Sequence, residues 1–386
     1  MMDFTRIRVL LLDGSGKQTL AMLRGLKEIG CHVTVLCATK LDTCYLSNKP
    51  DRKILNDKVI VRDEKAYQEL LSLVKTGDFD VVMPVGELGT NFVTDHEEEL
   101  KKYVKLACAP REVYIRAFNK QTTFDQAMRS GVPCSYTRRS DQNIADFLLH
   151  CRFPIIIKPR QGLGSIGFHK FETEDEFRSR LADSSFNVDD YVVQEFVTFE
   201  NRISANLFLD QNGNICTAYA VNALRWFPID AGAGVLSETV DAHDVIKYAG
   251  KLLHDLGWKG FAQVAFMVDK YTGGPKLLEI NGRIPASIKM AYMCGFNISR
   301  QMLEMIYDEP VIQYPENTKF GLYIRHFDTD LAWFFKSRDR FRAKPSWFSW
   351  KNTKEVIYSK DDPKPFWGHL FQRVFRYKSI MRRKKH

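Results

Sequence analysis

A chain of 386 residues is long enough to form two or three domains with sizeable cores. Hydrophobic residues make up 45% of it, and no run approaches the roughly 18 consecutive apolar residues of a membrane-spanning helix. The first residues, Met-Met-Asp-Phe-Thr-Arg, lack a signal-peptide pattern, and the eight cysteines are scattered without a CxxC pair. The sequence thus argues against a membrane-spanning protein, a zinc site and a disulfide framework, and we expect a cytoplasmic protein.

The charge is unevenly distributed along the chain. Lys and Arg number 56 against 47 Asp and Glu, which gives a net charge of +9. Residues 331–386 alone hold sixteen basic and four acidic residues, and four of the six tryptophans. The basic surplus therefore belongs to the C-terminal segment, which we interpret as a feature separate from the main body of the protein.

The N-terminal region shows the pattern of alternating strands and helices. An apolar run over 6–13 is typical of a buried parallel strand, residues 17–29 have helical spacing, and 32–37 predict a second strand. Further strands are predicted over 58–61 and 79–84, with a helix over 64–76 between them. This order predicts a doubly wound α/β domain over residues 1–115.

The turn at Asp13-Gly14-Ser15-Gly16 lies between the first strand and the first helix. It is not a Walker A loop, because Lys17 is followed by Gln18 and the upstream glycine is missing. Two interpretations stay open for it: a tight βα turn, or a substrate or phosphate site at the helix N-terminus.

The second region mixes helices with antiparallel strands. A helix is predicted over 119–131 and another over 241–256, a lid region over 154–192, a strand over 192–197, and hairpins pairing 203–209 with 215–222 and 261–269 with 276–281. Thr173 and Glu176 form a capping box, which predicts a helix that begins near Thr173.

The lid contains the glycine loop that first indicates nucleotide binding. The strand Ile-Ile-Ile-Lys158 ends in a loop with Gly162, Gly164, Ser165 and Gly167, and an extended segment follows. Glycines let backbone N–H groups approach phosphate oxygens, and a lysine supplies charge. The spacing matches GxGxxG, but a dinucleotide site needs a helix directly after the loop. A protein kinase is excluded because HRD and DFG are missing, which leaves a structural glycine hairpin as the alternative.

The last predicted hairpin gathers oxygen-bearing side chains. Because strand side chains alternate, Glu279 and Asn281 share one face, and a turn near Thr272 would place Gln263 opposite Glu279. Oxygen ligands together with triphosphate oxygens suit Mg²⁺. Arg283 follows and can bind a phosphoryl oxygen. An exposed polar strand face is the alternative.

These motifs, in this order, resemble the ATP-grasp superfamily over residues 116–310, and the Gln/Glu/Asn set is most similar to its carbamoyl phosphate synthetase-like branch. The resemblance implies an α/β N-terminal pre-ATP-grasp (Rossmann-like) domain over 1–115, followed by an α+β ATP-grasp fold over 116–315 with a lid subdomain over 120–197. Residues 316–386 would form a basic, aromatic-rich extension.

The resemblance also implies roles for individual residues. The phosphates of ATP would be bound by Lys120, Lys158, Gly162, Gly164, Ser165 and Gly167. The adenine edge would involve Gln194, Glu195, Phe196 and Val197. Two Mg²⁺ ions would be held by Gln263, Glu279 and Asn281, with Mn²⁺ left open as a replacement. Arg283 would stabilise the transferring phosphoryl group, since such chemistry depends on positioning and charge.

Two further positions concern the ribose and the substrate. The family usually has a ribose-binding Glu where this chain has Arg202, and Glu200 is the candidate substitute. Residues 225–234 predict a substrate loop in which Arg225 would hold an anion; a solvated loop arginine is the alternative.

The leading functional interpretation is an ATP-dependent ligase that activates a small-molecule carboxylate as an acyl phosphate and joins it to an amine. A carboxylase or carbamoyl-phosphate type of enzyme using bicarbonate is less favoured, because the chain shows no glutaminase domain, biotin-carrier motif or second ATP-grasp copy. A non-catalytic nucleotide-binding regulator is the third alternative.

The basic C-terminal segment allows two more interpretations. It lacks any RRM, KH or helix-turn-helix pattern, so we expect no specific nucleic-acid partner. Its interleaved aromatic and basic residues suit the boundary of an anionic membrane, and we expect peripheral contact with the inner membrane face. The alternative is that its aromatics cover the ATP-grasp core. A homodimer is left open.

Overall fold

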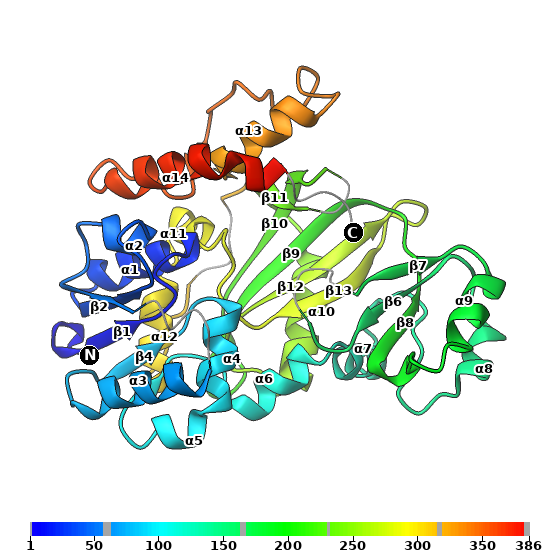
Figure 1. Ribbon diagram of the computed structural model, residues 1–386, viewed down its shortest axis with the longest axis horizontal. Coiled ribbons are helices and arrows are strands. Elements are labelled where there is room, and N and C mark those ends of the chain that lie inside the picture. The colour runs from blue at the N-terminus through cyan, green and yellow to red at the C-terminus, as the bar shows by residue number, and fades with distance from the viewer. Residues whose placement is uncertain (1, 57–62, 163–166, 230–231, 315–318, 382–386) are drawn as a thin grey trace.

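The computed structural model describes residues 2–56, 63–162, 167–229, 232–314 and 319–381, and contains three β-sheets (Figure 1). An all-parallel sheet lies at the N-terminal end, a long mixed sheet forms the middle, and a small antiparallel sheet lies at the far side of the middle sheet. The expected α/β region followed by an α+β region is therefore confirmed.

The N-terminal sheet has the strand order β3-β2-β1-β4-β5, with every pair parallel. Its strands are β1 (Arg8–Leu11), β2 (His32–Cys37), β3 (Arg52–Leu55), β4 (Val81–Met83) and β5 (Lys105–Leu106). Its helices, after a short 3₁₀ turn (Phe4–Arg6), are α1 (Lys17–Glu28), α2 (Thr43–Leu46), α3 (Glu64–Lys75), α4 (Glu87–Asp95) and α5 (Glu97–Leu100). Buried side chains point from both faces of β1 and β2, as parallel strands covered by helices require.

One N-terminal prediction cannot be compared and one strand was missed. The strand predicted over 58–61 lies outside the described residues. The strand next to β2 is β3, which the sequence did not indicate because Arg52–Leu55 at the sheet edge is largely exposed and lacks an apolar run.

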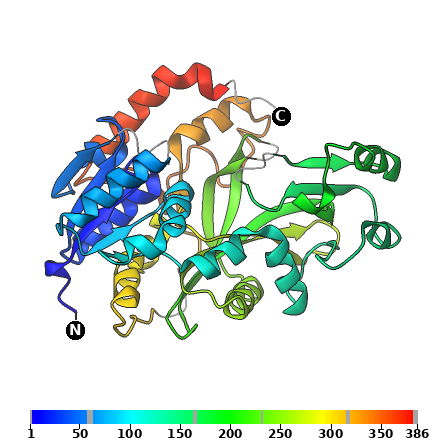
Figure 2. The ribbon, with the colours of Figure 1, turned by 60° about the horizontal axis from the view of Figure 1, so that its bottom comes forward.

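The central sheet has the order β13-β12-β9-β10-β11-β14-β15. Its strands are β9 (Phe199–Leu209), β10 (Ile215–Phe227), β11 (Ala233–Val240), β12 (Gly260–Asp269), β13 (Pro275–Asn281), β14 (Tyr323–Arg325) and β15 (Thr353–Glu355). One face is covered by α6 (Arg111–Phe118), α7 (Lys120–Arg129) and α10 (His243–Asp255). Towards the N-terminal sheet lie α11 (Lys289–Cys294) and α12 (Ile298–Ile306) (Figure 2).

The N-terminal and central sheets share one hydrophobic core. It runs from Val9 and Leu20 of the N-terminal region, through Met302 of α12, to Phe208 and Phe261 of the central sheet. Because apolar side chains fill the space between the sheets without interruption, the carboxyl ends of the N-terminal strands are held at a fixed place beside the central sheet.

The register of the β12–β13 hairpin corrects the sequence prediction. Gln263 pairs with Asn281, and Glu279 pairs with Ala265, because the turn and a β-bulge between Ala265 and Phe266 displace the expected pairing. The displacement is an even number of residues, so Gln263, Glu279 and Asn281 still share one face.

The small sheet, β7-β6-β8, forms the lid subdomain. It contains β6 (Ile155–Pro159), β7 (His169–Phe171), β8 (Tyr191–Glu195), α8 (Ile144–Leu148), α9 (Glu174–Leu181) and a 3₁₀ turn (Val188–Asp190), around a core of its own. The predicted helix start is confirmed, since Thr173 is the N-cap of α9 and its Oγ1 accepts from the N–H of Glu176 at 3.4 Å; the Glu176 carboxylate accepts from the N–H of Glu172 and not from that of Thr173 as in a capping box.

The C-terminal segment is not separate from the rest of the molecule, which corrects that interpretation. Its strands β14 and β15 extend the central sheet, and α13 (Phe327–Lys336) and α14 (Lys364–Met381) lie along one side of the molecule (Figure 1). The buried carboxylate of Asp362 accepts from Arg24 Nη2 at 2.9 Å and from Ser47 Oγ at 2.7 Å. Asp328 pairs with Lys17 at 2.8 Å, so the segment fastens the N-terminal helices to the central sheet.

None of the helices in the described part of the chain has both the length and the apolar character to cross a membrane.

Candidate active site

The oxygen-rich face of β9, β12 and β13 is the centre of the candidate site. The Gln263 side-chain amide donates to Asn206 Oδ1 at 3.2 Å, and that of Asn281 donates to Glu279 Oε1 at 3.3 Å. Both amides thus use their N–H groups within the protein and keep their carbonyl oxygens for a ligand. Asn206 was missed from the sequence, because its place beside Gln263 depends on the pairing of β9 with β12.

The donor set on this face fits Mg²⁺. In the described residues no cluster of three or more His, Cys, Asp or Glu side chains is placed to hold a metal ion. A metal here would instead be held by the Glu279 carboxylate, the Gln263 and Asn281 oxygens and the oxygens of a phosphate ligand, which are the hard donors that Mg²⁺ prefers.

Lys158 joins the lid to this face. It extends from β6, donates from Nζ to the carbonyl oxygen of Leu278 at 3.2 Å, and lies 4.4 Å from the ring centre of Phe124. Burial lowers the pKa of Lys158 to about 7, although the negative charge of Glu279 opposes this shift. A phosphate group placed beside Lys158 would restore its positive charge.

This lysine gives a testable pH dependence. Phosphate oxygens raise the pKa of Lys158, so between about pH 7 and that raised value the binding of ATP takes up a proton and weakens as the pH rises. Calorimetric titration with ATP in two buffers of different ionisation enthalpy measures this uptake. Lys158→Met should remove it, whereas Lys276→Met on β13 should keep it. Equal proton uptake in the Lys158→Met and wild-type proteins contradicts the assignment.

Lys120 contacts the first residue of the glycine loop, at the end of the lid strand β6. Asn119 caps α7 with its side chain, and Lys120 Nζ donates to the carbonyl oxygen of Gly162 at 3.1 Å. Gly167 has φ of +77°, and an added Cβ would lie 2.7 Å from Pro159 Cγ, so this position needs glycine. The predictions for Gly164 and Ser165 concern residues outside the described ranges.

The predicted adenine edge is partly occupied by contacts within the lid. Gln194 is buried and donates to Thr137 Oγ1 at 2.7 Å. The Glu195 carboxylate accepts from the N–H of Arg152 at 2.8 Å, and the ring of Phe196 lies under Lys170. Adenine contacts at Gln194, Glu195, Phe196 and Val197 stay predictions, and the side chain of Gln194 is committed to the lid.

The ribose assignment likewise stays a prediction. Glu200 is exposed at the start of β9. Its neighbour Arg202 donates to the carbonyl oxygen of Gly232 at 2.7 Å and lies over the ring of Trp226. Burial lowers the pKa of Arg202 and the charge of Glu279 opposes the shift, so Arg202 faces the same side of the sheet as Glu279.

The prediction for Arg225 is wrong. It lies on β10, where its guanidinium contacts both carboxylate oxygens of Asp330 at 3.0 Å and the carbonyl oxygen of Pro345 at 2.8 Å. Both Arg225 and Asp330 are almost fully buried. Arg225 therefore stabilises the contact of α13 with the central sheet, and its partner, 105 positions away, could not be seen in the local sequence.

Arg283 meets a residue that the sequence analysis did not single out. Its Nε lies 3.9 Å from Oε2 of Glu87, at the start of α4. Burial raises the pKa of Glu87; the charges of Arg283 and Lys120 act in the opposite direction, and that of Glu279 raises it further. Glu87 thus brings the N-terminal region next to Arg283. Its sequence signal was its position just beyond the carboxyl end of a buried parallel strand, where ligands bind in α/β sheets.

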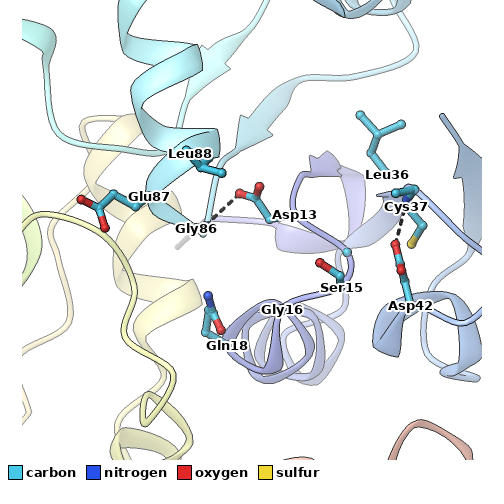
Figure 3. A pocket seen from close by; sticks show the side chains of 12 residues that line it. Asp13, Ser15, Gly16, Gln18, Leu36, Cys37, Asp42, Gly86, Glu87 and Leu88 are labelled. Carbon is cyan, nitrogen blue, oxygen red and sulfur yellow. Dashed lines mark hydrogen bonds between the residues drawn. The ribbon is translucent and has the colours of Figure 1, made fainter. Parts of the chain in front are cut away.

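A cavity of about 280 Å³ opens beside Glu87, at the carboxyl ends of β1, β2 and β4 (Figure 3). Asp13 shapes it: this residue has φ of +61°, and its carboxylate accepts from the N–H of Gly86 at 2.8 Å. Glu87 lies at the side of the cavity away from Asp42 and also lines a small gap shared with Asn281 and Arg283. The cavity therefore adjoins the face that carries Asn281.

The sequence of this chain resembles those of known proteins. Residues 117–287 match the family model of the ATP-grasp domain. The chain is 22% identical over 305 residues to the carbamoyl phosphate synthase large chain, N-terminal section, of Methanopyrus kandleri; the match covers 75% of this chain and 52% of that protein. The chain spans about half the length of this curated relative.

Two solved structures show the same fold. The biotin carboxylase domain of Hydrogenobacter thermophilus 2-oxoglutarate carboxylase, in complex with MgADP and bicarbonate, has a TM-score of 0.66 and 15% identity, covering 82% of this chain and 73% of that one. N5-carboxyaminoimidazole synthetase from Staphylococcus aureus has a TM-score of 0.65 and 14% identity, covering 88% and 87%.

A small antiparallel sheet that carries Lys158, facing a mixed sheet with an oxygen-rich face, is typical of a nucleotide-binding protein. The match over residues 117–287 assigns that part of the chain to the ATP-grasp domain, and a parallel α/β region precedes it. The resemblance drawn from the sequence is confirmed.

Proposed function

We propose that this protein is an ATP-dependent, ADP-forming ligase that activates a small-molecule carboxylate as an acyl phosphate and joins it to an amine. The observation that carries the proposal is the contact of Lys158, from the lid, with the carbonyl oxygen of Leu278, the residue next to Glu279 on the central sheet. A cation and a metal-binding carboxylate held on rigid strands on either side of one space suit the binding of a triphosphate.

The proposed role of each residue follows from its charge. Lys120 and Lys158 would bind the phosphates, and Glu279, Gln263 and Asn281 would hold two Mg²⁺ ions, or Mn²⁺ in their place. The metal neutralises charge on the phosphate oxygens when bound. Arg283 lies where it can contact the phosphoryl group in transfer, because its guanidinium is held towards the cavity beside Glu87.

A screen of ADP release tests the proposal directly. Full-length protein with Mg²⁺ and ATP is given pairs of small carboxylates and amines, each omitted in turn. We expect ADP formation that needs both members of one pair. ATP binding without ADP release across the whole panel would instead identify a non-catalytic nucleotide-binding protein.

A bicarbonate-using enzyme is the second candidate, because the structural neighbour bound to MgADP is described with bicarbonate. The same screen separates the two functions. Bicarbonate that stimulates ADP release without any organic carboxylate favours the second candidate, and dependence on an organic carboxylate favours the first.

The C-terminal segment supports the peripheral membrane contact that we include in the proposal. Aromatic side chains of α13, α14 and the segment between them contact one another in groups around Phe334, Phe327 and Phe366. The exposed members of these groups are Phe335, Phe341, Phe348, Trp350, Tyr358 and Trp367. Exposed aromatics beside basic residues suit an anionic lipid surface, where each Lys or Arg contributes about 1 kcal/mol.

Vesicle co-sedimentation tests this contact. The wild-type protein should bind vesicles that contain phosphatidylserine more strongly than neutral vesicles, and replacing Phe341 and Phe348 together by Ser should weaken binding. Tyr271→Ser is the control, because Tyr271 is an exposed aromatic on the distant β12–β13 turn. Equal binding of neutral and anionic vesicles contradicts the proposal. The homodimer is tested separately, by light scattering of the full-length protein.

A further inference from the structure

We propose that the aromatic hollow between β15 and the first turns of α14 binds one acyl chain of an anionic phospholipid, whose headgroup pairs with Lys354. This site rests on the membrane contact proposed above and gives that contact a defined binding place for lipid. It is independent of the ligase activity.

The aromatic hollow has a volume of about 580 Å³, which is within the range of small-molecule sites. Its wall contains Phe327 of α13, and Trp350 and Tyr358 from the two sides of β15. The residues of α14 that line it are Phe366, Trp367 and Leu370. The centres of neighbouring rings are 5.1 to 6.3 Å apart, so the aromatic side chains form one continuous apolar wall.

The wall leaves large apolar side chains in contact with water. Exposure is 47% for Trp350 and 61% for Trp367. Among the described residues, every exposed Phe or Trp apart from Phe168 and Phe320 lies between positions 335 and 371. Because apolar surface gathered in one exposed region marks a site of interaction, we expect an apolar ligand at this hollow.

Trp350 is held in place by a buried cation. The guanidinium carbon of Arg325 lies 4.4 Å from the centre of the Trp350 ring, and Arg325 pairs with Asp330 of α13 at 3.2 Å. Neither charged side chain has any exposed surface. This part of the wall is therefore already ordered before a ligand arrives, which lowers the entropic cost of binding.

The polar groups beside the wall are mostly used within the protein. Thr353 Oγ1 donates to the carbonyl oxygen of Lys351 at 3.0 Å. The Glu355 carboxylate accepts from the N–H groups of Ile357 and Tyr358, both at 2.6 Å. A sugar or a peptide would leave several of its own polar groups without partners against this wall, which is costly. A hydrocarbon chain has no such groups, so the wall suits it better.

Lys354 is the exception among these polar groups. It lines the hollow and is exposed, and it forms no ion pair with a carboxylate of the described residues. The surrounding segment, 331–386, holds sixteen basic and four acidic residues. A cation beside an apolar wall is complementary to a ligand that carries a negative charge at the end of a hydrocarbon chain, which is the chemistry of an anionic phospholipid.

The hollow is continuous with the exposed aromatics proposed to contact the membrane. The ring of Trp347 lies 6.4 Å from that of Phe327 in the hollow and 4.6 Å from that of Phe334. Phe334 in turn contacts Phe341 and Phe348, at 5.6 and 5.8 Å. This row of rings gives an acyl chain an apolar path from the membrane surface to the hollow. The lid lies apart from α14 in both views (Figures 1 and 2), so a lipid here leaves the lid free to move.

A lipid that is soluble without a bilayer tests the site by itself. Dihexanoylphosphatidylserine, kept below its micelle concentration, is titrated into the full-length protein and followed by tryptophan fluorescence and calorimetry. We expect saturable binding with a change in emission, because Trp350 and Trp367 line the hollow. Glycerophosphoserine, which has the same headgroup without chains, should not bind, and dihexanoylphosphatidylcholine should bind more weakly.

Two matched pairs of variants locate the binding. Trp367→Ala removes part of the wall and should weaken binding about tenfold or more. Phe371→Ala, which removes an aromatic of similar exposure from the same helix but outside the lining, should keep wild-type affinity. Trp367→Phe should bind well with a smaller change in emission. Lys354→Gln should weaken binding about fivefold, and Lys360→Gln, an equal change of charge outside the lining, should not.

The outcomes distinguish this site from the membrane contact and from the ligase. The site is overturned if the wild-type protein does not bind the short-chain lipid, or if Trp367→Ala and Phe371→Ala bind it equally, even when the protein still co-sediments with anionic vesicles. Equal affinities of Lys354→Gln and Lys360→Gln overturn the placing of the headgroup. Short-chain binding that depends on Trp367 and Lys354, without co-sedimentation, supports the site and contradicts the membrane contact alone. ADP release decides the ligase function separately.

Discussion

Replacing Glu279 by Gln should abolish Mg²⁺-dependent ADP formation while the protein stays folded. The substitution keeps the size of the side chain and removes the negative charge of the one carboxylate among the three proposed metal ligands. Several kcal/mol of charge stabilisation depend on such a ligand, so we expect a loss of about a thousandfold or more in turnover. Steady-state ADP release over a range of Mg²⁺ concentrations measures the loss.

The control for this experiment distinguishes a loss of metal binding from a loss of folding. Glu98→Gln removes an exposed carboxylate from α5 and should keep wild-type turnover. Circular dichroism and thermal unfolding should be similar for both variants. If the Glu279→Gln variant forms ADP at the wild-type rate, Glu279 does not bind the metal ions. The assignment of Gln263 and Asn281 as metal ligands then fails as well.

Asp362→Ala should strongly destabilise the protein. Only 1% of the Asp362 surface is exposed, and its carboxylate accepts from Arg24, from Ser47 Oγ and from the N–H of Asn48. Removing one partner of a buried ion pair leaves the other charge uncompensated, which costs about 3–5 kcal/mol. Denaturant unfolding of the full-length protein should show this as a lower midpoint.

The next residue provides the matched comparison. The Asp361 side chain is 62% exposed and pairs with Lys49 at the surface, so Asp361→Ala should cost about 1 kcal/mol or less. Both variants remove a carboxylate from the same turn, and only one removes it from the interior. If the two variants unfold at the same denaturant concentration, Asp362 does not fasten the C-terminal segment to α1 and α2.

Side-chain periodicity and local turn signals determined much of the fold from the sequence. The apolar runs at β1, β2 and β4 predicted a parallel sheet, and the alternation along β13 placed Glu279 and Asn281 on one face. Thr173 and Glu176 located the start of α9. These features depend on residues within a few positions of one another, where the sequence carries the information directly.

The site needed the tertiary structure wherever its partners are distant in the chain. The turn and the bulge together move the partner of Gln263 from Glu279 to Asn281, two positions along β13, so the sequence predicted the shared face and missed the pairing. Arg225 looked like a substrate-binding residue until Asp330 was found against it. A buried charge is recognised by its partner, and nothing local indicates where that partner lies.

Glu87 is the clearest example of what only the tertiary structure decided. The sequence placed it after a buried strand of the N-terminal region, nearly two hundred positions before Arg283, with no motif to join them. The shared core between the two sheets brings that strand end to the face of the central sheet that carries Asn281. The local sequence determined the helices and strands and the faces that carry the polar side chains. The packing of apolar surfaces that are distant in the chain determined which of those faces meet. Burial drives this packing, but no short stretch of the sequence shows which surfaces will be in contact.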